Sequence, residues 1–404
     1  MGSVDLKLRI SGAPGAYKVT AQLDNVSAES DLGELPDNLR QQLEPLQKSI
    51  LLTTEGLRTR SLGPAQPRPE NSPPPVNAAA GSGGILNFVA GADRKNIQEI
   101  GLKLFNCVFQ QDVYALYRKA LEDAQKKTGV DLPIKLYVEP AELAYIPWET
   151  MFDKKADAYL CCYGMTPFAR TATLNFEDIY IYDKPPINIL GMISAPKSFI
   201  GTPRELDTDA EQTALNNALA PLSTQVNLCW TTSGTFRELK RRVIKGNNGK
   251  RWDVFLFIGH GLERNIVLEE DGGTGYEVLS ADDLKGLLTG PLGPRLVILN
   301  SCRGAQPIDK GDRFASTAET LVRGGGIAAV VAMQFDISDI MGTTFSPAFF
   351  GNLMEDVPIH QAMTLTRLDL RHRGFSEWIS PVLYMQNKDG HVVPPAEAPA
   401  NTGT

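Results

Sequence analysis

Two short apolar stretches stand out in the pattern of hydrophobic and polar positions along the chain: residues 255–261 (FLFIGHG) and residues 296–303 (LVILNSCR). Each is rich in β-favouring residues, is too short for a buried helix, and ends in a turn of small residues. Near-continuous apolar runs are typical of central strands in a parallel sheet, because helices cover both faces of such a sheet. We therefore predict two central strands, whose ends carry His260 and Cys302.

The same pattern predicts the elements on either side. Residues 4–10 and 17–23 alternate apolar and polar positions around a turn, which indicates a β-hairpin. Residues 97–128 repeat with a helical period that breaks near Gln110, which indicates two amphipathic helices. Further strands are predicted at 134–138, 187–194, 226–230, 253–258, 296–299 and 327–333, and helices at 36–49, 205–219, 236–243, 281–288, 312–323, 343–354 and 359–371. This alternation predicts an α/β fold with a doubly wound, mainly parallel sheet flanked by helices, after a β-rich N-terminal segment.

Composition and charge narrow the class of protein. With 404 residues, 42% hydrophobic and 22% charged, the chain has the composition of a globular protein with two or three domains. No apolar stretch approaches the ~18 residues of a membrane span, and the N-terminus lacks a signal pattern, so we expect a cytoplasmic protein without a membrane partner. A net charge of -7 argues against nucleic acid as the main partner.

The cysteines and histidines do not have the spacing of a metal site. The five cysteines are odd in number and include no CxxC pair, which favours reduced thiols. Three of the histidines, His360, His372 and His391, are scattered without an i, i+4 pair. We predict neither a metal nor a cofactor.

His260 and Cys302 are the candidates for chemistry. Active sites of parallel sheets lie beyond the carboxyl ends of the strands, where both side chains are predicted. A free thiol with a pKa near ~8.5 is mostly protonated at neutral pH, so a nucleophilic cysteine needs a base, and His260 can supply it. The N–H groups of Gly261 and Cys302 can hold an oxyanion. The alternative is a buried inert thiol beside a core histidine, but equivalent positions in consecutive β-α units favour a reactive pair.

The flanks of these two residues resemble a known family. GHG at 259–261 and LNSCRGA at 299–305, with PWE at 147–149 upstream, resemble the CHAT domain, the caspase-like and separase-like cysteine peptidases of bacteria, over about residues 95–385. The resemblance implies a caspase-like fold, His260 as general base and acid, Cys302 as nucleophile, and Gly261 with Cys302 as the oxyanion hole.

The resemblance and a composition change together divide the chain. Six prolines fall between residues 58 and 84, followed by Ala, Gly and Ser, which indicates a flexible linker or surface loop. We expect a β-rich N-terminal segment at 1–57, this linker at 58–84, a degenerate buttressing α/β half at 85–184, the catalytic domain at 185–388 and a flexible tail at 389–404.

A third strand end is expected to select the substrate. Residues 334–340 (QFDISDI) resemble the separase-like loop whose carboxylate receives an Arg or Lys side chain. Asp339 matches the usual motif, and Asp336 stands where many CHAT sequences have Pro, so either can point into the pocket. The alternative is that these aspartates cap the next helix.

Together these features predict a cysteine endopeptidase that cleaves a protein partner after a basic residue, through a thioester. Two other functions stay open: a silent scaffold that binds a partner through the same groove, and a small-molecule amidohydrolase. The Pro-rich stretch and the tail predict control by an activating partner or sensor. The resemblance also implies a bacterial antiphage or cell-death role with a gasdermin-like substrate.

Overall fold

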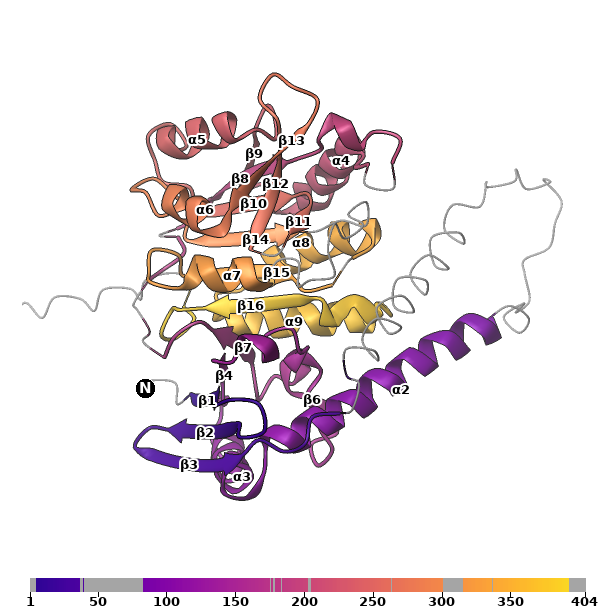
Figure 1. Ribbon diagram of the computed structural model, residues 1–404, viewed down its shortest axis with the longest axis vertical. Helices are drawn as coiled ribbons and strands as arrows, with labels where there is room; N and C mark the ends of the chain where they lie inside the picture. The colour runs from indigo at the N-terminus through magenta and orange to yellow at the C-terminus, as the bar shows by residue number, and fades with distance from the viewer. Residues whose placement is uncertain are drawn as a thin grey trace, which may run out of the picture.

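The centre of the molecule is one sheet of 11 strands, in the order β3-β2-β1-β4-β7-β16-β15-β14-β10-β8-β9. The computed structural model describes residues 5–36, 39, 83–174, 176, 179–182, 184–202, 205–262, 264–300, 315–335 and 337–391; of 83–94, 315 and 339 it describes the backbone alone. In Figure 1 the sheet runs from the N-terminal strands at the bottom to β8 and β9 at the top. Neighbouring strands pair in parallel except at β1–β2, β2–β3 and β15–β16.

The strands of this sheet come from the whole described chain. They are β1 (Leu6–Ser11), β2 (Lys18–Leu23), β3 (Val26–Asp31), β4 (Ile134–Val138), β7 (Phe168–Thr171), β8 (Ile187–Ile193), β9 (Val226–Trp230), β10 (Val254–Ile258), β14 (Leu296–Asn300), β15 (Ala329–Met333) and β16 (Pro381–Met385). The predicted mainly parallel α/β sheet is therefore confirmed, as is the hairpin at the N-terminus.

The central strands are buried on both faces, as their apolar sequences predict. Every residue of β10, β14 and β15 is buried. Alternate residues face opposite sides: Leu256 belongs to one hydrophobic cluster, and Phe255 and Phe257 belong to the other. Each cluster forms where helices pack on one face of the sheet.

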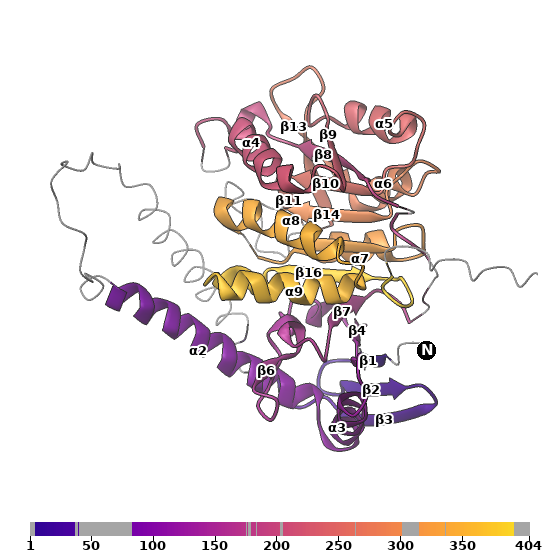
Figure 2. The same ribbon diagram turned by 180° about the vertical axis from the view of Figure 1, so that it is seen from behind.

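The helices lie in layers on the two faces of the sheet. In the C-terminal half, α5, α6 and α7 cover the face toward the viewer in Figure 1, and α4, α8 and α9 cover the face seen in Figure 2. Their bounds are α4 (Thr208–Leu219), α5 (Phe236–Lys245), α6 (Ala281–Leu288), α7 (Ala315–Val322), α8 (Asp339–Leu353) and α9 (Ile359–His372). Two helices, α2 (Gly83–Val108) and α3 (Gln111–Gln125), belong to the N-terminal half, and both views show α2 projecting from the body.

Several elements were not predicted. The strands β7 and β16 join the two halves, because β16 pairs with β15 on one side and with β7 on the other. The segment of residues 143–152 forms short 3-10 turns, η1 (Ala141–Leu143) and η2 (Trp148–Thr150), where a turn and a helix start were expected. The predicted helix at 36–49 and linker at 58–84 lie almost entirely outside the described residues.

A second, smaller sheet follows β10. It has three antiparallel strands, β11 (Gly261–Leu262), β12 (Asn265–Glu269) and β13 (Tyr276–Ser280). This sheet continues directly from His260, so it sits at the carboxyl edge of the main sheet. Within the described part of the chain, no helix is long and apolar enough to cross a membrane.

Candidate active site

The two central strands β10 and β14 end side by side, just before the predicted dyad positions in the sequence. Their parallel register pairs Ile258 with Asn300. His260 stands two residues after Ile258, and Cys302 stands two residues after Asn300 in the sequence. Cys302 itself lies outside the described residues, so the dyad geometry stays a prediction.

Gly259 allows the strand ends to approach each other closely. Its N–H donates to the carbonyl oxygen of Asn300 at 3.2 Å, and the N–H of Ser194 donates to the carbonyl oxygen of Ile258 at 2.9 Å. A Cβ at position 259 would stand 2.6 Å from the ring of Phe257 and 3.3 Å from the carbonyl oxygen of Ser194. Any side chain before His260 would therefore displace the ring of Phe257 and crowd the end of β8.

His260 is buried, with 3% of its surface exposed. The ring of Phe199 meets the imidazole edge-on, with centroids 4.9 Å apart and planes at 84°. The carbonyl oxygen of His260 accepts a hydrogen bond from the N–H of Val267 at 3.0 Å. The backbone of His260 is thus held by the small sheet, and its imidazole packs against the ring of Phe199.

Gly261 presents its amide away from the small sheet. It is paired antiparallel with Ile266. In antiparallel pairs, hydrogen-bonded and non-hydrogen-bonded residues alternate. Because the carbonyl of His260 bonds to Val267, that pair is the hydrogen-bonded one, and Gly261 takes the position whose N–H points away from β12.

On one side of these residues lies the segment after β8, residues 194–200, which we call the β8 flank. The Glu269 carboxylate of β12 fastens it, accepting from the N–H of Ala195 at 3.1 Å and of Gly234 at 2.9 Å. A Cβ at position 234 would stand 2.6 Å from the Cα of Ser194, so the contact requires glycine. Glu269 thereby joins the small sheet to the ends of β8 and β9.

On the other side lies the segment after β15, residues 334–338, which we call the β15 flank. Its first residue, Gln334, donates from Nε2 to Glu149 Oε2 at 3.0 Å and to the carbonyl oxygen of Ile379 at 2.8 Å. Its Oε1 accepts from Arg170 Nη2 at 3.1 Å. The sheet order places β14 and β10 between the two flanks.

Glu149, of the PWE motif, is a buried structural carboxylate. Arg170 donates to it twice, from Nε to Oε1 at 2.9 Å and from Nη2 to Oε2 at 2.5 Å. The same guanidinium donates to the carbonyl oxygens of Ala144 and Ile146. Burial is the largest single effect and lowers the pKa of Arg170, but Glu149 and Tyr384 together outweigh burial, so the pKa is raised above its ordinary value.

Ser338 closes the β15 flank. Its N–H donates to Glu377 Oε1 at 2.6 Å, and its hydroxyl donates to Glu377 Oε2 at 3.2 Å and accepts from the N–H of Met341. Ser338 is thus the N-cap of α8, and the alternative that an aspartate caps this helix is wrong. Asp339 is the first residue of α8, and Asp336 lies outside the described residues.

The sequence did not reveal Phe199, Glu269, Arg170, Gln334 or Glu377. For Glu269 a signal was present, because apolar stretches at 265–269 and 276–280 flank DGGTG, a hairpin pattern. For the others the partners are far apart in the chain. Among the described residues, no three His, Cys, Asp or Glu side chains are grouped for metal binding.

Comparison with known proteins agrees with this architecture. A family model described as the CHAT domain matches residues 101–376. No curated protein matches the sequence.

Among solved structures, the fold is similar to that of separase from Saccharomyces cerevisiae in a separase–securin complex at 3.0 Å, with a TM-score of 0.52 and 11% identity. The match covers 95% of this chain but only 30% of the separase chain, so this chain corresponds to less than a third of the separase chain's length. Caspase-1 from Spodoptera frugiperda also matches, with a TM-score of 0.31 and 12% identity over 54% of this chain and 90% of that one.

Proposed function

We propose a peptidase function from one premise: the chain belongs to the CHAT domain family, whose model matches residues 101–376. In this proposal it is a cysteine endopeptidase that cleaves a protein partner, with Cys302 as nucleophile and His260 as general base and acid. The observation that carries it is the pairing of Ile258 with Asn300, each two residues before a member of the dyad. Chains that leave paired parallel strands after equal offsets emerge at the same edge of the sheet.

The proposed reaction is acyl transfer. His260 takes the thiol proton of Cys302, and the thiolate Sγ attacks the carbonyl carbon of the scissile peptide bond. The N–H groups of Gly261 and Cys302 stabilise the oxyanion. His260 then gives its proton to the leaving amine, and a thioester remains. Water, deprotonated by His260, attacks the thioester, releases the carboxylic acid product and restores the thiol.

Mutation of the dyad tests the chemistry. Cys302→Ala and His260→Ala should each lower cleavage by at least about a thousandfold. Cys229→Ala is the matched control, because Cys229 is a partly exposed thiol in β9, outside the site. Cleavage retained by Cys302→Ala would refute the proposal.

Thiol labelling tests the same proposal without a substrate. Burial raises the pKa of Cys107 to about 11 and raises that of Cys161 well above its ordinary value. Iodoacetamide at neutral pH should therefore spare these thiols in the folded chain, since only thiolates react. It should modify Cys302 quickly in the wild type and more slowly in His260→Ala. Equal rates in both proteins would mean that His260 does not activate the thiol.

For specificity we propose cleavage after Arg or Lys, with Asp336 and Asp339 as the candidate acceptors. A carboxylate can pair bidentately with a guanidinium, which favours Arg. In support, the two ends of the β15 flank, Gln334 and Ser338, are both held by buried side chains. Fluorogenic peptides with Arg, Lys, Asp or Leu before the cut distinguish the pockets, and equal turnover of the Asp peptide would contradict a basic preference.

We further propose that a protein partner controls the site. The yeast separase with a similar fold was solved in complex with securin. A gasdermin-like substrate and a role in bacterial antiphage defence or cell death in the cytoplasm complete the proposal. Full constitutive activity of the purified chain would contradict control by a partner. Partner binding that survives Cys302→Ala with full biological effect would instead indicate a scaffold, and amide hydrolysis without new protein N-termini would indicate an amidohydrolase.

A further inference from the structure

We propose that Phe199, Ile200, Tyr276 and Val278 form an apolar subsite beside His260, which binds a hydrophobic side chain of the substrate on the leaving-group side of the scissile bond. This inference rests on the proposed peptidase function and names a specificity element for it. The subsite is built from the β8 flank and the edge strand β13. None of these four residues was a candidate from the sequence.

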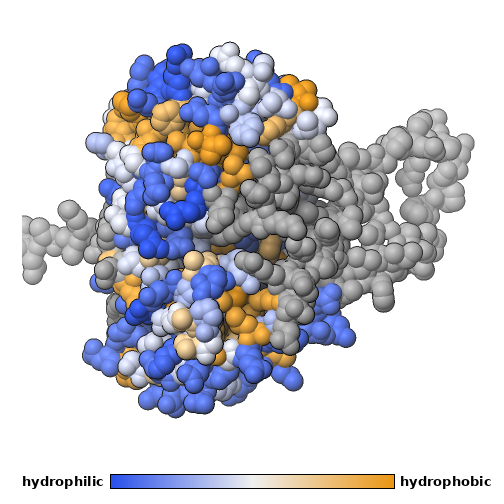
Figure 3. Space-filling view, in the orientation of Figure 1, coloured by the Kyte–Doolittle hydropathy of each residue, from blue (hydrophilic) through white to orange (hydrophobic). Residues whose placement is uncertain are grey.

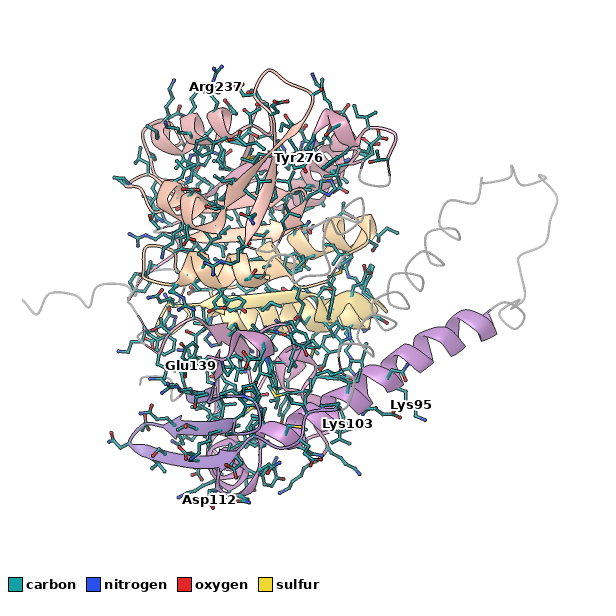
Figure 4. The ribbon with its side chains drawn as sticks, in the orientation of Figure 1. Lys95, Lys103, Asp112, Glu139, Arg237 and Tyr276 are labelled. Carbon is teal, nitrogen blue, oxygen red and sulfur yellow. The ribbon has the colours of Figure 1, made fainter. Side chains whose placement is uncertain are left out.

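Exposed apolar side chains gather at this place. Among the described residues, five large hydrophobic side chains are exposed, and three of them are Ile200, Tyr276 and Val278, with 65%, 46% and 45% of their surface exposed. Contiguous exposed apolar groups typically mark binding surfaces. Figure 3 shows apolar residues on the upper part of the molecule beside the grey atoms, and Figure 4 places Tyr276 in that upper part.

Ring contacts connect this surface to the catalytic base. Phe199 is 5% exposed and forms the floor. Its ring stands edge-on to the imidazole of His260, with centroids 4.9 Å apart, and lies 5.5 Å from the ring of Tyr276. Ile200 is the next residue in the chain. A side chain that packs on Phe199 and Tyr276 would therefore be separated from the imidazole of His260 by the ring of Phe199.

The register of the small sheet puts Tyr276 and Val278 on the same face as His260. Val278 is directly opposite Val267, and Tyr276 is directly opposite Glu269. Val267 is in turn hydrogen-bonded to the carbonyl of His260. Directly opposite residues in antiparallel strands project to the same face, so His260, Val267 and Val278 form one cross-strand row. Tyr276 stands two residues from Val278 and shares that face.

The Glu269 carboxylate on this face is already bonded to backbone amides. Glu269 lies opposite Tyr276, yet both of its oxygens accept hydrogen bonds from the backbone amides of Ala195 and Gly234. Redirecting this carboxylate to a basic ligand would leave those two amides without their acceptor. A hydrophobic side chain is therefore the ligand chemistry that fits.

The order of the strands assigns the side of the cut. In the strand order β15-β14-β10-β8, the β15 flank, proposed to receive the residue before the cut, lies beyond β14, the strand that precedes Cys302 in the sequence. The β8 flank lies on the opposite side, beyond β10, which precedes His260. The acyl group stays on Cys302, and His260 protonates the leaving amine. The polypeptide that begins with this amine thus extends from His260 over Phe199 and Tyr276.

Internally quenched peptides test the subsite in the full-length chain. All carry Arg before the cut, and the residue after it is Leu, Phe, Ser or Asp. Tyr276→Ala should lower kcat/KM about tenfold for the Leu and Phe peptides and less than about twofold for the Ser peptide, because only the former bury apolar surface. Val26→Ala and Ile244→Ala, which truncate the other two exposed side chains, should leave all peptides unchanged.

Binding to a Cys302→Ala chain separates this inference from the proposed chemistry. Fluorescence anisotropy of labelled Leu and Ser peptides should show tighter binding of the Leu peptide, and Tyr276→Ala should abolish the difference. That result without any cleavage by the wild type would uphold the subsite and refute the peptidase. Cleavage that is indifferent to the residue after the cut, or an equal loss for all peptides, would overturn the subsite alone. A change of oligomeric state with unchanged peptide binding would also overturn it, since the surface would then serve a second copy.

Discussion

The β15 flank and the β8 flank stand on opposite sides of His260, and their supports differ. The β15 flank begins at Gln334, which is bound by the buried pair of Glu149 and Arg170, and it ends at Ser338, which is bound by the buried Glu377. The β8 flank is fastened by Glu269, which is partly exposed, and it carries Ile200 into solvent.

The two flanks therefore suit different roles. A buried ion pair contributes little net stability, but breaking it leaves a charge in a low-dielectric interior, so such contacts tolerate almost no change. The β15 flank is therefore suited to hold one geometry, as a pocket for a fixed side chain requires. Exposed apolar residues contribute little to folding and can gain contacts only when a ligand covers them. The β8 flank is suited to binding.

The largest effect is expected where the β15 flank is attached. Glu149→Ala would leave Arg170 buried without its carboxylate and would remove one of the two acceptors of Gln334 Nε2, and it should lower the free energy of unfolding by roughly 3–5 kcal/mol. The side chains of Glu149 and Arg170 are 0% and 2% exposed. Urea unfolding followed by circular dichroism measures the change.

A surface pair of the same chemistry provides the control. Arg9 donates from both Nε and Nη2 to Glu139, but both side chains are 44% exposed. Glu139→Ala should therefore change stability by about 1 kcal/mol or less. Similar losses for Glu149→Ala and Glu139→Ala would show that burial does not distinguish the support of the β15 flank.

An intermediate effect is expected from pH, through the helix behind the β15 flank. His360 lies in α9, which packs against the turn η6 (Ser376–Ile379) that carries Glu377. Burial, followed by the nearby charge of Lys135, lowers the pKa of His360 to about 3, against opposing effects such as that of Asp5. The unfolded histidine binds a proton below about pH 6.5, while the folded one stays neutral. Stability is therefore complete above that pH and is lost as the pH falls toward 3.

The expected loss is about 2 kcal/mol between pH 7.5 and pH 5. Urea unfolding at a series of pH values measures it. His360→Asn removes the titrating group, so the difference between wild type and variant should shrink as the pH falls. A constant difference across this range would mean that the folded histidine titrates normally.

The strand ends of the site could be predicted because local pattern determines them. The runs of β10 and β14 are buried on both faces, and the spacing between them is enough for a helix and a crossover. This placed His260 at the carboxyl edge and made Gly261 a candidate donor. The domain limits and the roles of Cys302, Asp336 and Asp339 remain predictions.

The supports of the site could not be predicted because they join distant segments. Gln334 and Glu149 are 185 residues apart in the chain, and no periodicity connects them. The strand β16 was missed because it begins with Pro381, and proline argues against a central strand except at its first residue or at a bulge. Phe199 resembles any core aromatic until its ring is placed against His260.

The smallest effect on stability is expected on the β8 flank. Ile200 is 65% exposed, so most of its side chain is in water whether the chain is folded or unfolded, and Ile200→Ala should change the free energy of unfolding by less than about 0.5 kcal/mol. The same variant should lower kcat/KM several-fold for peptides with Leu after the cut. Ile244→Ala, at a site 61% exposed on α5, is the matched control and should change neither quantity. The loss in kcat/KM can be expressed as a free energy. If Ile200→Ala lowers the free energy of unfolding by as much as this value, the β8 flank is a structural support like the β15 flank, and the contrast between them fails.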